Sequence, residues 1–190
     1  TTSGGAASGC IPTQYDNVFF DANSFSGGGQ TVTLNVNSAC NSMDWTGATL
    51  NPILTGTVTL NIHGSLTLIS AMNNSYTGNL SFKATTTGQT ITSAGKTFGS
   101  HIYFNGTGGG WTLQDAFSST TKNVYLQRGD LNINSQNFTT YAFLSNYTLT
   151  RSLTLGASNV TCTGSGADGT YGTVAWSMAG SGYTFSAGTS

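Results

Sequence analysis

The stretch IYFNGTGGGWTLQDAFSSTTKNVYLQRGDLNI, residues 102–133, contains the same pattern twice. Two triplets of apolar residues around a tyrosine, IYF at 102–104 and VYL at 124–126, begin 22 residues apart. After each of them comes a second triplet, WTL at 111–113 and LNI at 131–133. Alternation of apolar and polar residues is typical of half-buried β-strands, so the stretch predicts two short strands in every repeat.

The same spacing extends beyond this stretch on both sides. LSF at 80–82 begins 22 residues before IYF, and a weaker series of single phenylalanines completes the repeat. The second series continues with Ile91, VTC at 160–162 and YTF at 183–185, and the phenylalanines are Phe98, Phe117 and Phe138. Three short strands per repeat describe one coil of a parallel β-solenoid, in which each strand stacks on its equivalent in the next coil. We therefore predict an all-β fold, a single right-handed parallel β-helix with about 22 residues per coil.

Two regions depart from the repeat. Residues 1–14, TTSGGAASGCIPTQ, form a Gly-, Ser- and Ala-rich N-terminal arm, which we expect to be ordered, and residues 15–190 form the solenoid domain. Residues 140–150 lengthen the interval between equivalent strands, which predicts an insertion or an extra half-coil. The inward parity of Cys162 predicts a small core residue.

The composition points outside the cell. Charged residues make up 6% of the chain, against about 25% in a typical soluble domain, and the net charge is −1. Five scattered basic residues cannot form a phosphate-binding patch, so nucleic acid is excluded as a partner. The sequence has no apolar run of about 18 residues, so we predict no membrane insertion. We predict a secreted protein, extracellular or on the cell surface.

Cysteines and sequons fit this compartment. The chain has three cysteines, and a Cys10–Cys40 disulfide would join the arm to the first coils. The alternative is three reduced thiols in a reducing compartment. N-x-S/T sequons at Asn73, Asn105 and Asn146 are predicted to lie on turns, which makes them the candidate glycosylation sites.

Two segments carry a family resemblance. LNIHGSLTLIS at 60–70 and RSLTLGASNVTCTG at 151–164 combine short alternating strands with Thr-, Ser- and Asn-rich turns. Over roughly residues 17–190 the chain resembles the right-handed parallel β-helix repeats of secreted bacterial adhesins and surface-fibre proteins. The resemblance is one of architecture and composition, and it implies a structural role. No functional residue follows from it.

Residues that would support catalysis or metal binding lack partners at suitable spacing. Glycoside hydrolysis requires two facing carboxylates, and the best pair, Asp115 and Asp130, occupies different positions within the coil. The tripeptide RGD at 128–130 combines a cation with a carboxylate and also matches a cell-adhesion motif, but a solvated turn explains it more simply. His63 and His101 have no further ligand at metal spacing. We predict that the protein is not an enzyme and needs no cofactor or metal.

Two functional hypotheses remain. The first is a non-catalytic extracellular structural protein, a subunit of a self-assembling fibre or surface adhesin whose copies join end to end by β-strand stacking. An alternative within it is a piece of a longer adhesin, in which neighbouring coils cover the ends. The second hypothesis is a carbohydrate-binding or polysaccharide-degrading β-helix. Tyr103 and Tyr125, one coil apart and exposed by parity, are candidate surface contacts with another rod or with surface glycans.

Overall fold

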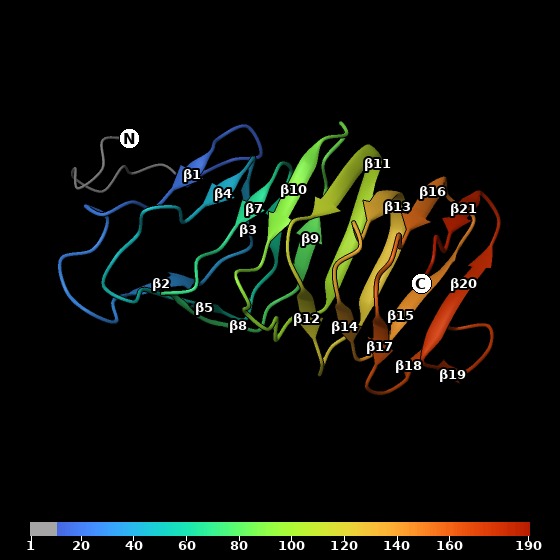
Figure 1. The fold of residues 1–190 in the computed structure, drawn as a ribbon. Helices are drawn as coiled ribbons and strands as arrows, with labels where there is room; N and C mark the ends of the chain where they lie inside the picture. Colours follow the sequence, from blue (N-terminus) through green and yellow to red (C-terminus); the bar gives the residue numbers. More distant parts are fainter. Residues whose placement is uncertain (1–10) are drawn as a thin grey trace.

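The computed structural model describes residues 11–190. In this part of the chain, parallel strands stack into a β-solenoid of about seven turns without any helix (Figure 1). The predicted all-β solenoid with a repeat of about 22 residues is thereby confirmed. Strands from β1 to β21 follow one another along the long axis of the molecule in Figure 1.

Each coil contributes a strand to three stacks, which we call the first, second and third columns. The first column contains β3 (Ser38–Cys40), β6 (Leu60–Ile62), β9 (Leu80–Phe82), the first halves of β11 (Ile102–Leu113) and β13 (Val124–Asn132), β15 (Phe143–Tyr147) and β20 (Trp176–Gly180). The second column contains β1 (Val18–Phe19), β4 (Met43–Asp44), β7 (Leu66–Thr67), β10 (Gln89–Thr92), the second halves of β11 and β13, β16 (Arg151–Thr154) and β21 (Tyr183–Ser186).

The third column closes the coil. It contains β2 (Thr31–Leu34), β5 (Ile53–Gly56) and β8 (Asn73–Tyr76), and then β12 (Phe117–Ser119), β14 (Phe138–Thr140) and β17 (Val160–Cys162). A bridge between Thr97 and Ser118 and a hydrogen bond from Asn74 Nδ2 to Thr97 O (3.3 Å) link the two groups. The predicted series of Phe98, Phe117 and Phe138 therefore lies in one column.

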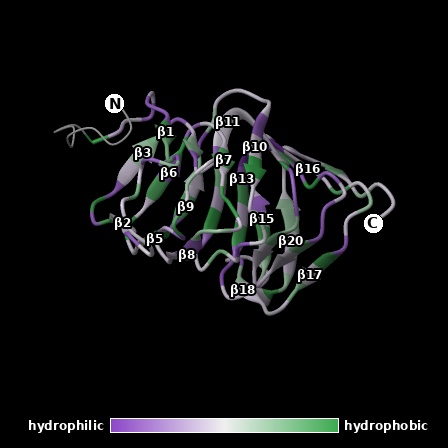
Figure 2. Cartoon of the chain, turned by 60° about the vertical axis from the view of Figure 1, so that its left-hand side comes forward, coloured by the Kyte–Doolittle hydropathy of each residue, from purple (hydrophilic) through white to green (hydrophobic). Residues whose placement is uncertain are grey.

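The core forms because alternate residues of each strand point inward. Ile102 and Phe104 are buried on either side of Tyr103, and Ile102 pairs with Val124 one coil later. Equivalent rings stack along the solenoid, with centroids 5.2 Å apart for Phe82 and Phe104. Burial of such ladders supplies the main stabilising free energy of the rod. Hydrophobic and hydrophilic residues accordingly mix along the stacked strands in Figure 2.

The prediction of an insertion at 140–150 is wrong. Residues 143–147 form β15, the next strand of the first column, and Phe143 pairs with Val124. VTC at 160–162 also belongs to another column than predicted, because β17 pairs with β14 and places Cys162 beside Thr140. The second-column strand of that coil is β16 instead. Both predictions were wrong because Val124 and Phe143, which pair in adjacent coils, are fewer than 22 residues apart in the sequence.

The true insertion is a hairpin of β18 (Gly166–Ala167) and β19 (Thr173–Val174), which pair antiparallel. It packs against the first column, since a Cβ on Gly166 would lie 3.0 Å from Leu144 Cδ1. Asp168 anchors it by accepting hydrogen bonds from Ser177 Oγ (2.6 Å) and Tyr171 N (2.7 Å). These bonds, that of Ser177 first, lower the pKa of Asp168.

Glycines allow the coils to approach at the corner between the first and second columns. A Cβ on Gly106 would lie 1.8 Å from Ala84 O, and one on Gly109 would lie 2.1 Å from the same oxygen. Gly129, the middle residue of the RGD tripeptide, has a φ of +83° and stacks on this corner. The tripeptide is thus part of strand β13, with Gly129 buried, and is not a solvated turn.

A buried cation joins the last two coils. Arg151 is 1% exposed, and its guanidinium donates to Tyr147 O, Leu149 O and Ser181 O at 2.8–2.9 Å. It also donates to Ser145 Oγ (2.6 Å), Ser145 O (2.8 Å) and Ala179 O. In residues 11–190 no carboxylate pairs with it. Burial lowers the pKa of Arg151, but an arginine stays protonated in proteins. Its buried positive charge is therefore stabilised by the dipoles of the surrounding carbonyl groups.

The predicted arm at 1–14 lies mostly outside the described residues. Its described part leads into a turn, in which Asp16 accepts hydrogen bonds from Thr13 N and Oγ1, and Asp16 O accepts one from Asn41 N (2.8 Å). In the part of the chain that the structure describes, no helix has the length and hydropathy of a membrane crossing.

Candidate functional site

The outward face of the first column carries a continuous row of side chains. The second residue of each strand in this column points away from the core, and the parallel register aligns these residues from coil to coil. The row consists of Ala39, Asn61, Ser81, Tyr103, Tyr125, Leu144 and Ser177. It is small and polar in the early coils, aromatic in the middle, and covered by the β18–β19 hairpin at Leu144.

Two neighbouring hollows, the first over this row and the second beside it, form a groove that we call the polar groove. The first, about 360 Å³, is lined by Asn37, Thr59, Asn61, Asn79, Ser81, Lys83, Tyr103, Asn105 and Gln127. The second, about 580 Å³, is lined by Gln14, Tyr15, Asn41, His63, Lys83, Thr85, Thr86, Asn105, Gly106 and Thr107. Lys83 and Asn105 belong to both hollows and join them.

The two predicted tyrosines form the aromatic part of the groove. The rings of Tyr103 and Tyr125 stack with centroids 4.8 Å apart and planes 5° apart. Asn123 Nδ2 donates a hydrogen bond to Tyr125 Oη (2.9 Å), which holds the ring of Tyr125 in place. One face of Tyr103 therefore rests on Tyr125, and the other faces the coil of Ser81 and the first hollow. Burial, and then the neighbouring tyrosine hydroxyls, raise the pKa of Tyr103, so it is neutral at physiological pH.

Among the described residues, Lys83 is the only fully charged one that lines the polar groove. Within residues 11–190 no acidic side chain pairs with its ammonium group. Burial, and then the charge of Lys83, lower the pKa of His63, and burial and Lys122 lower that of His101 beside the tyrosine stack. Both histidines are therefore neutral near pH 7. The groove thus combines amides, hydroxyls and aromatic rings with one free positive charge.

The candidate glycosylation sites lie in strands and not, as predicted, on turns. Asn73 begins β8 and is exposed, whereas Asn105 and Asn146 are half-buried within β11 and β15. Asn105 lines the polar groove. Strand signals at these positions were hidden because the repeat is irregular around the corner glycines and in the coil of β15.

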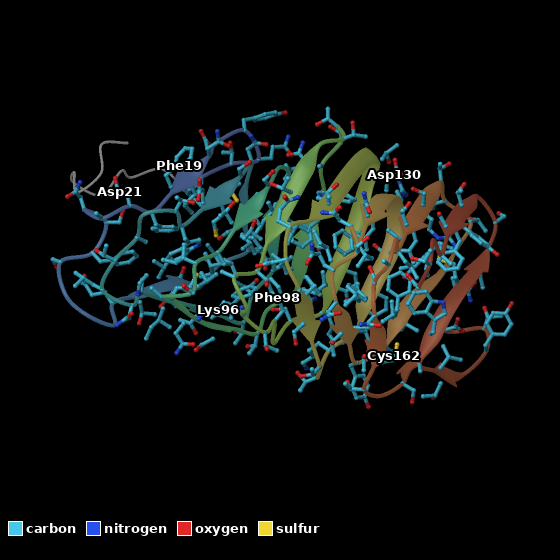
Figure 3. All side chains as sticks on the ribbon, in the orientation of Figure 1. Phe19, Asp21, Lys96, Phe98, Asp130 and Cys162 are labelled. Atoms are coloured by element: carbon cyan, nitrogen blue, oxygen red, sulfur yellow. The ribbon has the colours of Figure 1, made fainter. Side chains whose placement is uncertain are left out.

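The two described cysteines are free thiols. Cys40 is buried, and its burial raises the pKa of its thiol to about 12, while Cys162 is half-buried. Cys10 lies outside the described residues, so the Cys10–Cys40 disulfide stays a prediction. Figure 3 places Cys162 on the edge formed by the third column.

The candidate catalytic carboxylates are engaged in the fold. Asp115 accepts hydrogen bonds from the backbone of Ser93 (2.7 Å) and Ala94 (2.5 Å) in the coil before it. Asp130 accepts one from Ser152 Oγ (2.6 Å) and lies on the second-column edge (Figure 3). Neither lines the polar groove. Among the residues that the structure describes, no three His, Cys, Asp or Glu side chains gather around a common point that could hold a metal ion.

A second candidate surface lies at the last coil. Leu155, Val160, Trp176 and Phe185 line a hollow of about 550 Å³ together with Ser158, Asn159, Ala187 and Ser190. Phe185 is 44% exposed, and every residue of β21 is exposed. In the first coil Phe19 is 66% exposed, and its pairing with Asp44 places it on the outward face of the second column.

No family model, curated protein or solved structure matches the chain. Sequence reasoning found Tyr103 and Tyr125 from strand parity, but it missed the rest of the polar groove. The signal was present in the polar residues that recur beside the first-column strands, such as Asn37, Thr59 and Asn79. The sequence alone does not show that these residues align along the groove, because that depends on the register in which the coils stack.

Proposed function

We propose that the protein is a non-catalytic structural protein of the cell exterior, a subunit of a fibre or surface adhesin whose copies join end to end. In this proposal the last coil of one copy stacks on the first coil of the next. The contact is heterologous, because it uses two different surfaces, and such contacts extend into open fibres unless they close into a ring. Parallel ladders and a layered core would make each subunit a stiff rod.

The uncovered apolar last coil is the observation that carries this proposal. Trp176 and Phe185 continue the core ladders of Phe143 and Leu153, but their outer sides face the hollow and the solvent. The backbone of β21 pairs with β16 on one side, which leaves its other edge available for a further strand. A next coil with an apolar residue in line with Phe185 would cover this surface.

The first coil offers a surface of matching chemistry. The partly buried Val18 and Val32 pack on the core and belong to the same second and third columns that end at β21 and β17. The chain has only 6% charged residues, so long-range repulsion between copies is weak. The same composition supports the extracellular assignment.

Sedimentation velocity over a range of concentrations tests the proposal. The wild-type protein should sediment as species that grow with concentration, whereas Phe185→Asp should remain a monomer because it places a charge in the contact. Tyr171→Asp is the matched control, since Tyr171 is 64% exposed on the hairpin and does not line the apolar hollow of the last coil. A wild-type protein that stays monomeric at all concentrations would exclude self-stacking and favour further coils of a longer chain as the cover.

A further inference from the structure

We propose that the polar groove binds an extended acidic polysaccharide, with a sugar ring on Tyr103 and a uronate carboxylate on Lys83. This site is separate from the end-to-end contact, because the groove follows the side of the rod across several coils. The inference rests on three features of the groove: its repeated polar lining, the free face of an aromatic ring, and an unpaired cation.

The polar lining suits a long, hydroxyl-rich ligand. Amide side chains such as Asn61, Asn79 and Asn105 both donate and accept hydrogen bonds, as sugar hydroxyls do. In the described part of the chain, Asn61 Oδ1 is buried without a hydrogen-bond partner, although its side chain lines the hollow. Because strands of adjacent coils lie about 4.8 Å apart, the lining repeats along the groove and matches a ligand that is itself a repeating chain.

A step in side-chain size creates the place for a sugar ring. The outward row changes from Ser81 to Tyr103 between adjacent coils, so the free face of the Tyr103 ring stands above a small residue. The stack on Tyr125 holds the ring in place, which lowers the conformational entropy lost on binding. Apolar faces of sugars pack on aromatic rings of this kind, while their hydroxyls reach the surrounding amides.

The charge selects an acidic ligand. Lys83 lies where the two hollows join, and within residues 11–190 no carboxylate lines either of them. Lys122 and Arg128 lie near the same face, beside His101 and Thr107 respectively. A uronate carboxylate at Lys83 would form a charge-assisted hydrogen bond without displacing an existing ion pair.

Titration calorimetry with polygalacturonate and with its methyl ester tests the proposal, in the presence of a chelator and at a protein concentration at which the sample is monomeric. The two polymers share a backbone and differ in charge. We expect the free acid to bind about tenfold more tightly than the ester, and more weakly as salt is added. Lys83→Gln should remove this difference, whereas Lys96→Gln is the matched control on the third-column side (Figure 3).

Tyr103→Ala should weaken binding of both polymers at least about tenfold, and Tyr103→Phe should retain most of it because the ring remains. Thermal unfolding of each variant verifies that the solenoid is intact. Equal affinities for the acid and the ester, or acid binding that Lys83→Gln leaves unchanged, would overturn the proposal. Absence of binding at millimolar uronate would overturn it as well. None of these outcomes depends on whether the rods stack end to end.

Discussion

Removal of the buried guanidinium of Arg151 should loosen the last two coils of the solenoid. Arg151→Met keeps a long apolar side chain but removes all five N–H donors. The acceptors that lose their partner are Ser145 Oγ and the carbonyl oxygens of residues 145, 147, 149, 179 and 181. These carbonyls belong to β15 and the turn after it, and to β20 and the turn before β21, so the substitution affects the contact between coils.

The size of the effect follows from the hydrogen bonds. A bond to a charged group contributes about 1.5–3 kcal/mol, and five donors would give more than 7 kcal/mol. Relief of the cost of burying the charge, and access of water to some carbonyls, reduce this sum. We therefore expect Arg151→Met to lower the free energy of unfolding by about 4 kcal/mol. Arg151→Lys should lose about half as much, because an ammonium group has three donors.

Urea unfolding measures the loss, and hydrogen exchange locates it. Exchange should increase in residues 145–151 and 179–183 while the early coils remain protected. Lys96→Met is the matched control: Lys96 donates one hydrogen bond, to Ser70 O (2.7 Å), at an exposed site, and should cost less than about 1 kcal/mol. An Arg151→Met protein within about 0.5 kcal/mol of the wild type would refute the assigned role of the guanidinium.

Three further predictions concern the rest of the rod. Gly106→Ala should destabilise the protein by about 1–3 kcal/mol in urea unfolding, because its Cβ would overlap a carbonyl oxygen of the previous coil, whereas Gly27→Ala meets no atom within 4 Å and should be nearly neutral. The pKa of Asp168 is lower in the folded than in the unfolded protein, so its ionised carboxylate stabilises the fold above the pKa of the unfolded carboxyl. The melting temperature should therefore decrease as the pH is lowered below about 4, and this decrease should be smaller in Asp168→Asn. Burial raises the pKa of Cys40 to about 12, so the neutral thiol stabilises the fold below the pKa of the unfolded thiol, and stability should decline above about pH 9. In reduced protein at pH 8, an alkylating reagent should modify Cys40 only after unfolding.

The sequence predicted the core better than it predicted the coil boundaries. The repeated triplets identified Phe82, Phe104 and Leu126 as inward residues, because a strict alternation reports which side of a strand is buried. It could not assign strands where the coil length changes. The coil that contains β15 is short, and the hairpin at 166–174 then lengthens the next interval, so counting from Val124 reached the wrong column.

The groove and the buried arginine show the same limit. Parity placed Tyr103 outward, but Lys83 follows the end of β9, and Asn105 lies within β11 at a register shift that interrupts the alternation. Arg151 shares the inward parity of Leu153, yet its charge argues against burial until the carbonyls that surround it are known. Such partners come from turns of two different coils, and local sequence does not reveal their meeting.

Negative-stain electron microscopy of the native protein tests end-to-end stacking most directly. The wild-type protein should form long unbranched filaments about one solenoid wide, and Phe185→Asp should give single short rods under the same conditions. Filaments that disappear in reductant would in addition assign a Cys10 disulfide to the contact. Wild-type samples that contain only rods of one molecule would contradict end-to-end stacking.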